Sequence, residues 1–235
     1  RFGYDGYTAF DALVNWDLTK ADTAADIVPG LAESWEASSD GTAWTFHLRQ
    51  NAKWSDGVQV TGKDWRFTWQ TAMNAKYKDH IDPLGWEDIT SVKGNGKVVT
   101  VTWKRNFAAW KGLFTYVLPA HALQGEDMLT VWNDCICNPK KGNAPIADGP
   151  FLLTRFDRGS GITLTRNNAG WFGPKAKLDS IVFRFITNTN SEIQAIRAGE
   201  VDAIYPQPQL QLAQLRGQSG LKVQTNAGTT LEHID

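Results

Sequence analysis

The stretch WTFHLRQNAKWSDGVQVTGKDWRFTWQ (residues 44–70) contains four tryptophans and decides how the first half of the chain is interpreted. Residues 44–49 alternate, with Trp44, Phe46 and Leu48 on one face and polar side chains on the other. An alternation of apolar and polar residues is typical of a strand that buries one face. We therefore predict a half-buried strand at the start of this stretch.

A helix is predicted directly after the strand. The Ser-Asp-Gly sequence at 55–57 indicates a turn, and Thr61 with Asp64 three residues later has the pattern of an N-cap followed by an acidic N3 residue. The apolar side chains that follow recur at helical spacing and define one face: Trp65, Trp69, Ala72 and Met73. We expect this amphipathic helix to run to about Tyr77.

The four tryptophans have two interpretations. In a carbohydrate-binding module, aromatic rings lie together, exposed on one surface. Here Trp44 falls on a strand, Trp54 in a loop, and Trp65 and Trp69 on a helix. Rings at the core-facing positions of different elements are typical of internal packing. We expect most of them to be buried, with a tryptophan-rich carbohydrate-binding module as the alternative.

Composition bounds the class of protein. The chain has 235 residues, 42% of them hydrophobic and 21% charged, which is globular composition for one large or two small domains. A net charge of −1 argues against nucleic acid as a partner, because phosphates need a basic face. No apolar run approaches the roughly 20 residues that span a bilayer. The chain begins at Arg1, and we expect a processed or missing N-terminus, which leaves a signal peptide undecided.

The middle of the chain contains two predicted hairpins and a further strand. The segment SVKGNGKVVTVTWKRN at 91–106 turns at Asn95-Gly96, and the segment 149–167 turns at 159–161. The sequence LDSIVFRFI at 178–186 is predicted to be one more strand.

The last quarter has a different pattern. A short helix is predicted with Asn190 as N-cap and Gly199 at C′, followed by a strand at 201–205. A strand, a helix and a second strand make a βαβ unit, which predicts parallel pairing in part of the sheet. Another helix at 208–220 and a strand at 221–226 follow. Because no linker separates this α/β region from the hairpin-rich first half, we expect one domain inserted into another.

Motifs for catalysis, metal binding and cofactor binding are absent. The histidines have no metal-ligand spacing, and the chain has neither a G-x-S-x-G elbow nor a phosphate-binding glycine loop. Several carboxylates have a simpler role as turn residues, helix caps or solvated charges: Asp56, Asp64, Glu87 and Asp88. We therefore expect no enzyme activity, no metal site and no cofactor.

The two cysteines, Cys135 and Cys137, have only one residue between them. This spacing rarely permits relaxed disulfide geometry, and one pair does not complete a zinc site. Free thiols, a strained local disulfide and a partner cysteine beyond this chain all remain open.

Several motifs, in order, resemble family 5 solute-binding proteins of ABC importers, which include dipeptide-, oligopeptide- and nickel-binding proteins. The signature covers 29–70, with a Leu-Ala-x-Ser-Trp run, an aromatic-x-Phe-x-Leu-Arg strand, Trp-x-Asp-Gly and a capped helix. Gly62 stands where the family usually has Ala. The resemblance continues through VLPAHAL at 117–123, the Gly-Pro hairpin in 146–173 and the Ala-Gly-Glu-x-Asp helix end in 181–205.

The resemblance implies a mixed α/β fold of the type II periplasmic-binding-protein kind. Residues 1–14 and 147–235 would form an incomplete first lobe, and 15–146 an inserted, smaller α+β domain rich in hairpins. Family members are about twice as long, so we expect the second lobe to be missing from this chain.

The implied function is capture of dipeptides or oligopeptides between two lobes and delivery to permease subunits in the membrane. The resemblance implies a monomer located in the periplasm or attached to the cell surface, with an oligosaccharide-binding member of the same family as the alternative. Ligands of open α/β sheets bind beyond strand ends, which together with the resemblance predicts these contacts: Tyr7, Thr8, Tyr205, Pro206, Gln207, Asn226, Gly228, Thr229 and Thr230.

Overall fold

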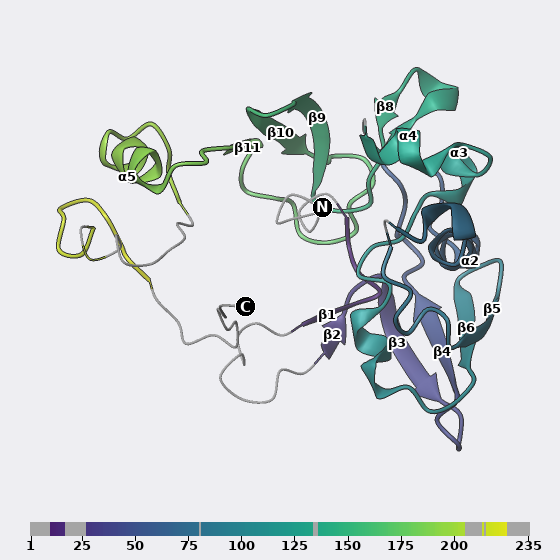
Figure 1. The fold of residues 1–235 in the computed structure, drawn as a ribbon. Coiled ribbons are helices and arrows are strands. Elements are labelled where there is room, and N and C mark those ends of the chain that lie inside the picture. Colours follow the sequence, from purple (N-terminus) through teal and green to yellow (C-terminus); the bar gives the residue numbers. More distant parts are fainter. Residues whose placement is uncertain are drawn as a thin grey trace. The chain divides into compact units, whose positions relative to one another are not determined.

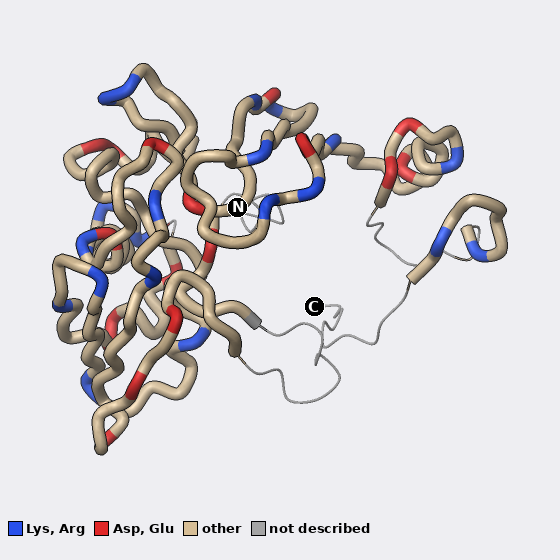
Figure 2. Tube along the Cα trace, turned by 180° about the vertical axis from the view of Figure 1, so that it is seen from behind, with Lys and Arg blue, Asp and Glu red and all other residues tan. Residues whose placement is uncertain are grey.

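The computed structural model describes residues 10–16, 27–79, 81–133, 136–204, 213 and 215–224. The chain divides into two compact units, Arg1–Phe183 and Arg184–Asp235 (Figure 1). Lysines and arginines are interspersed with acidic residues along the first unit (Figure 2), in keeping with the near-zero net charge.

A four-stranded antiparallel sheet forms the centre of the first unit. Its strands are β3 (Ala32–Ala37), β4 (Ala43–Leu48), β5 (Ile89–Lys93) and β6 (Val98–Trp103), in the order β3-β4-β6-β5. The predicted alternation is confirmed, because Phe46 and Leu48 are buried while His47 is only half-buried. The hairpin that turns through Asn95 and Gly96 is also confirmed, since β5 and β6 pair on either side of it.

Helix α2 (Gly62–Ala72) packs against β5 and β6. Its predicted cap is confirmed: a carboxylate oxygen of Asp64 accepts the N–H of Thr61 at 2.8 Å. The helix ends before the predicted Tyr77, because the side chain of Asn74 accepts the N–H of Lys76 and starts a 3₁₀ turn, η2 (Ala75–Tyr77).

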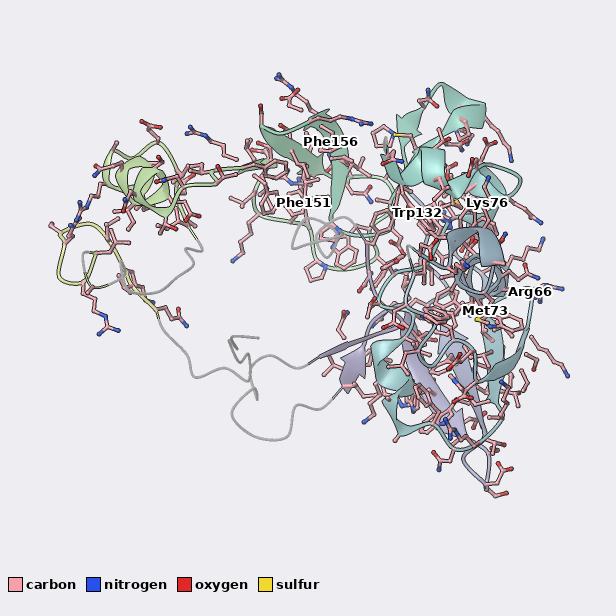
Figure 3. The ribbon with its side chains drawn as sticks, viewed as in Figure 1. Arg66, Met73, Lys76, Trp132, Phe151 and Phe156 are labelled. Atoms are coloured by element: carbon pink, nitrogen blue, oxygen red, sulfur yellow. The ribbon has the colours of Figure 1, made fainter. Side chains whose placement is uncertain are left out.

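The predicted inner face of this helix is correct for Trp65 and Ala72, which are buried, and Trp69 is half-buried. It is wrong for Met73, which is 43% exposed. Met73 is the C-cap residue, with φ −88° and ψ 0°, so the regular helical positions end before it. Figure 3 shows Arg66 and Met73 at this helix and Lys76 just beyond its end.

None of the tryptophans with a described side chain is exposed, and only Trp16 of the 11 falls outside that description. The fully buried ones are Trp54, Trp65, Trp103 and Trp110. Trp44 and Trp110 contact each other with planes inclined by 40°, which is not a coplanar platform. The described rings therefore serve as core, and they do not form the exposed surface that a carbohydrate-binding module needs.

Several short elements are found in this unit besides the four-stranded sheet and α2. They are β1 (Val14–Trp16), β2 (Ile27–Pro29), η3 (Ala108–Gly112), α3 (Ala120–Leu123), α4 (Met128–Asn133), β7 (Cys137–Asn138), η4 (Pro139–Lys141) and β8 (Ala144–Pro145). Strand β1 pairs with β2, and β7 with β8. Cys137 is disulfide-bonded, whereas Cys135 lies outside the described residues.

A second, smaller core lies under a three-stranded sheet in the order β11-β10-β9. Its strands are β9 (Phe151–Asp157), β10 (Gly161–Arg166) and β11 (Ser180–Arg184). The antiparallel pairing of β9 and β10 confirms the predicted hairpin. Phe151 at the start of β9 is buried, whereas Phe156 near its end is partly exposed (Figure 3).

In the second unit, α5 (Thr189–Arg197) is the predicted helix with a different first residue. The N-cap is Asn188, whose side chain accepts the N–H of Ser191 at 3.1 Å, so the prediction of Asn190 was wrong. Gly199 has φ +70°, as predicted for C′.

The two strands predicted after α5 are wrong where they are described. Residues 201–204 and 221–224 have no strand assignment. A strand forms only where a neighbouring strand satisfies its N–H and C=O groups, and no described residue does so here. Residues 208–212 and 214 of the helix predicted at 208–220 lie outside the described residues, and the described remainder is not α-helical, with a turn at 215–217.

Candidate functional site

The residues predicted to contact ligand all lie outside the described part of the chain. They are Tyr7, Thr8, Tyr205, Pro206, Gln207, Asn226, Gly228, Thr229 and Thr230. What the structure does describe is the framework in the first unit at the predicted boundaries between the inserted domain and its lobe. In the predicted arrangement the chain would cross these boundaries twice, near residues 10–13 and 145–150, and we call these two segments the first and second crossing.

The first crossing, residues 10–13, is held by backbone hydrogen bonds on both sides. The N–H of Leu31 donates to the carbonyl of Ala12 at 2.8 Å, and the N–H of Leu13 donates to the carbonyl of Phe114 at 3.0 Å. Gly30 is required beside this segment, because a Cβ there would lie 2.4 Å from the Ala12 oxygen. The crossing is therefore a fixed part of the core that leads from the N-terminal segment into β1.

The second crossing, residues 145–150, leads from β8 to β9. The N–H of Ser55 donates to the Ala147 carbonyl at 2.8 Å, and the Ser55 hydroxyl donates to the Pro145 carbonyl at 3.2 Å. On the other side, the amide of Asn167 donates to the Gly149 carbonyl at 2.9 Å. The Trp-Ser-Asp-Gly loop and Asn167, which follows the second strand of the Gly-Pro hairpin, thus both hydrogen-bond to the second crossing.

The two crossings are joined by two buried aspartates, and we call residues 10–13 and 145–150 together the crossover junction. The N–H of Asp11 donates to one carboxyl oxygen of Asp148 at 3.2 Å. Asp11 itself accepts the N–H of Ala12 at 2.8 Å and the side-chain amide of Asn15 at 2.9 Å. Burial raises the pKa of Asp11, and burial together with the charge of Asp11 raises the pKa of Asp148 well above its usual range.

A second polar network surrounds Asp56 in the Trp-Ser-Asp-Gly loop. One carboxylate oxygen lies 3.0 Å from Nε2 of His121, 3.3 Å from the Lys141 ammonium and 3.3 Å from the Asn138 amide. Burial opposes ionisation, but the hydrogen bond and charge of His121, with the hydrogen bonds of the Val58 N–H and Lys141, together outweigh it and lower the pKa of Asp56. The neighbouring Ser55 hydroxyl donates to the second crossing and not to His121. The bonds of Asp56 to His121 and Lys141 connect the loop to α3 and η4.

The other carboxylates also have the local roles that their positions in the sequence predicted. Asp64 is buried and accepts the N–H groups of Thr61 and Ala120 at 2.8 and 2.9 Å, which joins α2 to the Pro-x-His segment. Burial raises the pKa of Asp64, and these hydrogen bonds oppose the rise. Asp88 pairs with Arg105 at 2.9 Å.

Neither a metal site nor a membrane span is present in the part of the chain that the structure describes. Its histidines, cysteines and acidic residues do not gather in any group of three or more able to hold a metal ion. None of its helices combines the length and the apolar content needed to cross a bilayer.

The sequence did not single out Asp11 or Asp148. A signal for Asp148 was available, because it opens the Asp-Gly-Pro segment that follows the predicted boundary at 146. No local pattern connects it to Asp11, which lies 137 residues earlier in the chain.

Comparison with known proteins places this architecture among bacterial extracellular solute-binding proteins. The model of bacterial extracellular solute-binding proteins, family 5 Middle, matches residues 26–235, and the chain belongs to that family.

Relatives and solved structures agree with this assignment. The dipeptide-binding protein DppE of Bacillus subtilis (strain 168) is 29% identical over 227 residues, which are 90% of this chain and 40% of DppE. The periplasmic EDTA-binding protein EppA is 30% identical, with a TM-score of 0.70 over 84% of this chain and 37% of that one. The oligopeptide-binding protein AppA of Bacillus subtilis, solved in complex with a nonapeptide, is 25% identical, with a TM-score of 0.69 over 83% of this chain and 37% of that one.

The chain spans about 40% of the length of the relatives that it matches. The first-lobe fold inferred from the ordered motifs is thus consistent with the mixed α/β structure and its neighbours. The predicted domain boundaries at 14/15 and 146/147 stay predictions.

Proposed function

We propose that the chain is part of the solute-binding component of an ABC importer. The component would capture dipeptides or oligopeptides outside the cytoplasm, enclose them between two lobes by a hinge motion and deliver them to permease subunits. The observation that carries this proposal is the family match over residues 26–235. The proposal assigns the protein no chemical reaction.

Peptides are the ligand class favoured by the relatives. DppE is named for dipeptides, and AppA was solved with a nonapeptide. EppA, named for EDTA, shows that structures of this kind also receive solutes of other chemistry. Extended peptides suit such a cleft, because main-chain hydrogen bonds hold any sequence while hydrated pockets tolerate varied side chains.

We propose that the ligand is contacted by the residues predicted from the sequence: Tyr205, Pro206, Gln207, Asn226, Gly228, Thr229 and Thr230, with Tyr7 and Thr8 as further contacts. The support for these residues is the family resemblance, because the strands expected before them are not formed at residues 201–204 and 221–224. The N-terminal contacts lie two and three residues before Phe10, where the buried first crossing begins. A fixed crossing immediately after them would limit the positions open to their side chains.

Native mass spectrometry of the full-length protein, purified from its own source, tests the ligand class. We expect co-purified masses of short peptides, released on denaturation. In a thermal-shift panel, peptides should raise Tm, since a ligand at 100 times its Kd stabilises the folded state by about 2.7 kcal/mol. A shift with oligosaccharides alone would support the alternative, and no shift with any peptide, sugar or metal chelate would contradict the transport proposal.

The proposed contacts need a separate test. Tyr205→Ala and Asn226→Ala should each weaken binding of the peptide found above, measured by calorimetry. Met73→Ala is the matched control, because Met73 is an exposed residue of the tryptophan-rich region. Unchanged affinity in both cleft variants would remove these loops from the site and leave the peptide proposal standing.

A further inference from the structure

Asp148 occupies an unusual position for a carboxyl group. It is fully buried at the crossover junction, with 0% of its surface exposed. One oxygen accepts the N–H of Asp11 at 3.2 Å, and the other has no hydrogen-bond partner among the described residues. A buried carboxylate normally has several donors or a cation, because ionisation without them is costly.

The charged groups facing this position do not compensate an ionised Asp148. Asp11, on the first crossing, and Asp64, on α2, are both acidic and disfavour a second negative charge. Arg49, after β4, acts on Asp11, but its Nε donates to the Gly30 carbonyl at 2.7 Å and its guanidinium lies 4.9 Å from the ring centre of Phe172. No described cation bonds to either junction carboxyl.

The partner group on Asp11 is a backbone N–H, which bonds to a carboxyl oxygen whether or not the acid carries a proton. The neutral acid keeps this bond between the crossings without adding a charge beside Asp11. The ionised form would keep the same bond while adding a buried, uncompensated charge next to a second acidic group. The two protonation states therefore differ in the cost of the buried charge and not in the hydrogen bond to Asp11.

We propose that Asp148 holds a proton at neutral pH and joins the two crossings as a neutral acid, so that its ionisation loosens the crossover junction. This effect of Asp148 ionisation does not depend on which ligand binds, because Asp148 lies in the framework and not in the proposed contact loops. The contribution of Asp148 to the stability of the described framework is largest at acidic pH and is lost as pH rises.

The direction follows from proton linkage. The ordinary pKa of an aspartate is 3.8, and that of Asp148 is raised in the folded protein. Below 3.8 both states hold the proton and the contribution to stability is complete. As pH rises toward the folded-state pKa, the unfolded chain releases the proton and the folded chain keeps it, so stability falls. This group therefore increases the unfolding equilibrium constant by up to about tenfold per pH unit within that window.

Urea denaturation of the full-length protein between pH 4 and pH 9 tests the proposal with Asp148→Asn. Asparagine keeps an oxygen for the Asp11 N–H and cannot ionise. The unfolding equilibrium constant of the variant should therefore rise less steeply with pH than that of the wild type, by up to about tenfold per pH unit. The free energy of unfolding of the variant, relative to that of the wild type, should increase as pH rises. Asp79→Asn, at an exposed position, is the matched control and should keep the wild-type slope. An unchanged slope in Asp148→Asn would overturn the proposal.

A direct measurement covers the case in which Asp148→Asn does not fold. Carbon-13 NMR of the side-chain carboxyl in the wild-type protein reports protonation without any substitution. We expect the chemical shift of a protonated acid for Asp148 at pH 7. The shift of a carboxylate at pH 7 would contradict the proposal whatever the variants do.

Discussion

The tryptophan-rich sheet and the 184–235 unit differ in how many of the backbone N–H and C=O groups of their described segments find partners within the same region. In the sheet, β4 has a neighbour on both sides and α2 covers β5 and β6. In the 184–235 unit, α5 closes its own backbone bonds, but 201–204 and 221–224 find no strand partner among the described residues. Sequence patterns were therefore reliable for the paired strands and the capped helices, and they failed for the two strands that find no partner among the described residues.

Removing a core tryptophan should have the largest effect on the sheet region. Trp65 on α2 is fully buried in the main core, so Trp65→Ala should reduce the free energy of unfolding by about 3–5 kcal/mol. Met73→Ala, just beyond the same helix, is the control and should change it by less than about 0.5 kcal/mol. Chemical denaturation of the full-length protein measures both. Equal losses of unfolding free energy in the two variants would mean that α2 does not bury the face that carries Trp65.

Removing the carboxylate of Asp64, the buried N3 residue of α2, should have the second largest effect on the free energy of unfolding. Asp64→Ala leaves the N–H groups of Thr61 and Ala120 without their acceptor, and each unpaired buried group costs about 1–3 kcal/mol. We expect a loss of about 3 kcal/mol in unfolding free energy, and a smaller loss for Asp64→Asn, which retains one carbonyl oxygen. If both variants matched wild type in denaturation, the link between α2 and the Pro-x-His segment would carry no stability.

The cap of α5 should give the smallest effect and tests the corrected helix start directly. Asn188→Ala removes the acceptor of the Ser191 N–H and should destabilise the helix by about 1 kcal/mol. Asn190→Ala, two residues later in the first turn of α5, leaves the Asn188 cap bond in place and serves as the control. Hydrogen exchange of the Ser191 amide should accelerate several-fold in the first variant only. Acceleration in the second variant alone would restore the start predicted from the sequence.

The parts of the fold that sequence could predict follow from periodicity and caps. The strand around Phe46, the cap of Asp64 on Thr61, and the turns at Asn95 and Gly159 all depend on residues a few positions apart. The end of α2 was missed because Asn74 competes for the backbone through its side chain, an interaction that apolar spacing does not register.

The framework around the candidate site was partly visible in the sequence. The ordered motifs marked the Trp-Ser-Asp-Gly loop and the Gly-Pro hairpin, and the structure brings both to the second crossing through Ser55 and Asn167. The contact of Asp11 with Asp148 could not be predicted, because a tertiary pair separated by 137 residues leaves no periodic trace. The proposed ligand contacts remain predictions.

The central claim is that the aromatic side chains of residues 44–70 are core and that ligand is held elsewhere. A crystal structure of the full-length protein with its co-purified ligand tests this most directly. We predict ligand contacts from 205–207, Asn226 and 228–230, and we predict that Trp54 and Trp65, which are buried, do not contact the ligand. A ligand stacked on the indole rings of Trp44, Trp54, Trp65 or Trp69 would contradict the account.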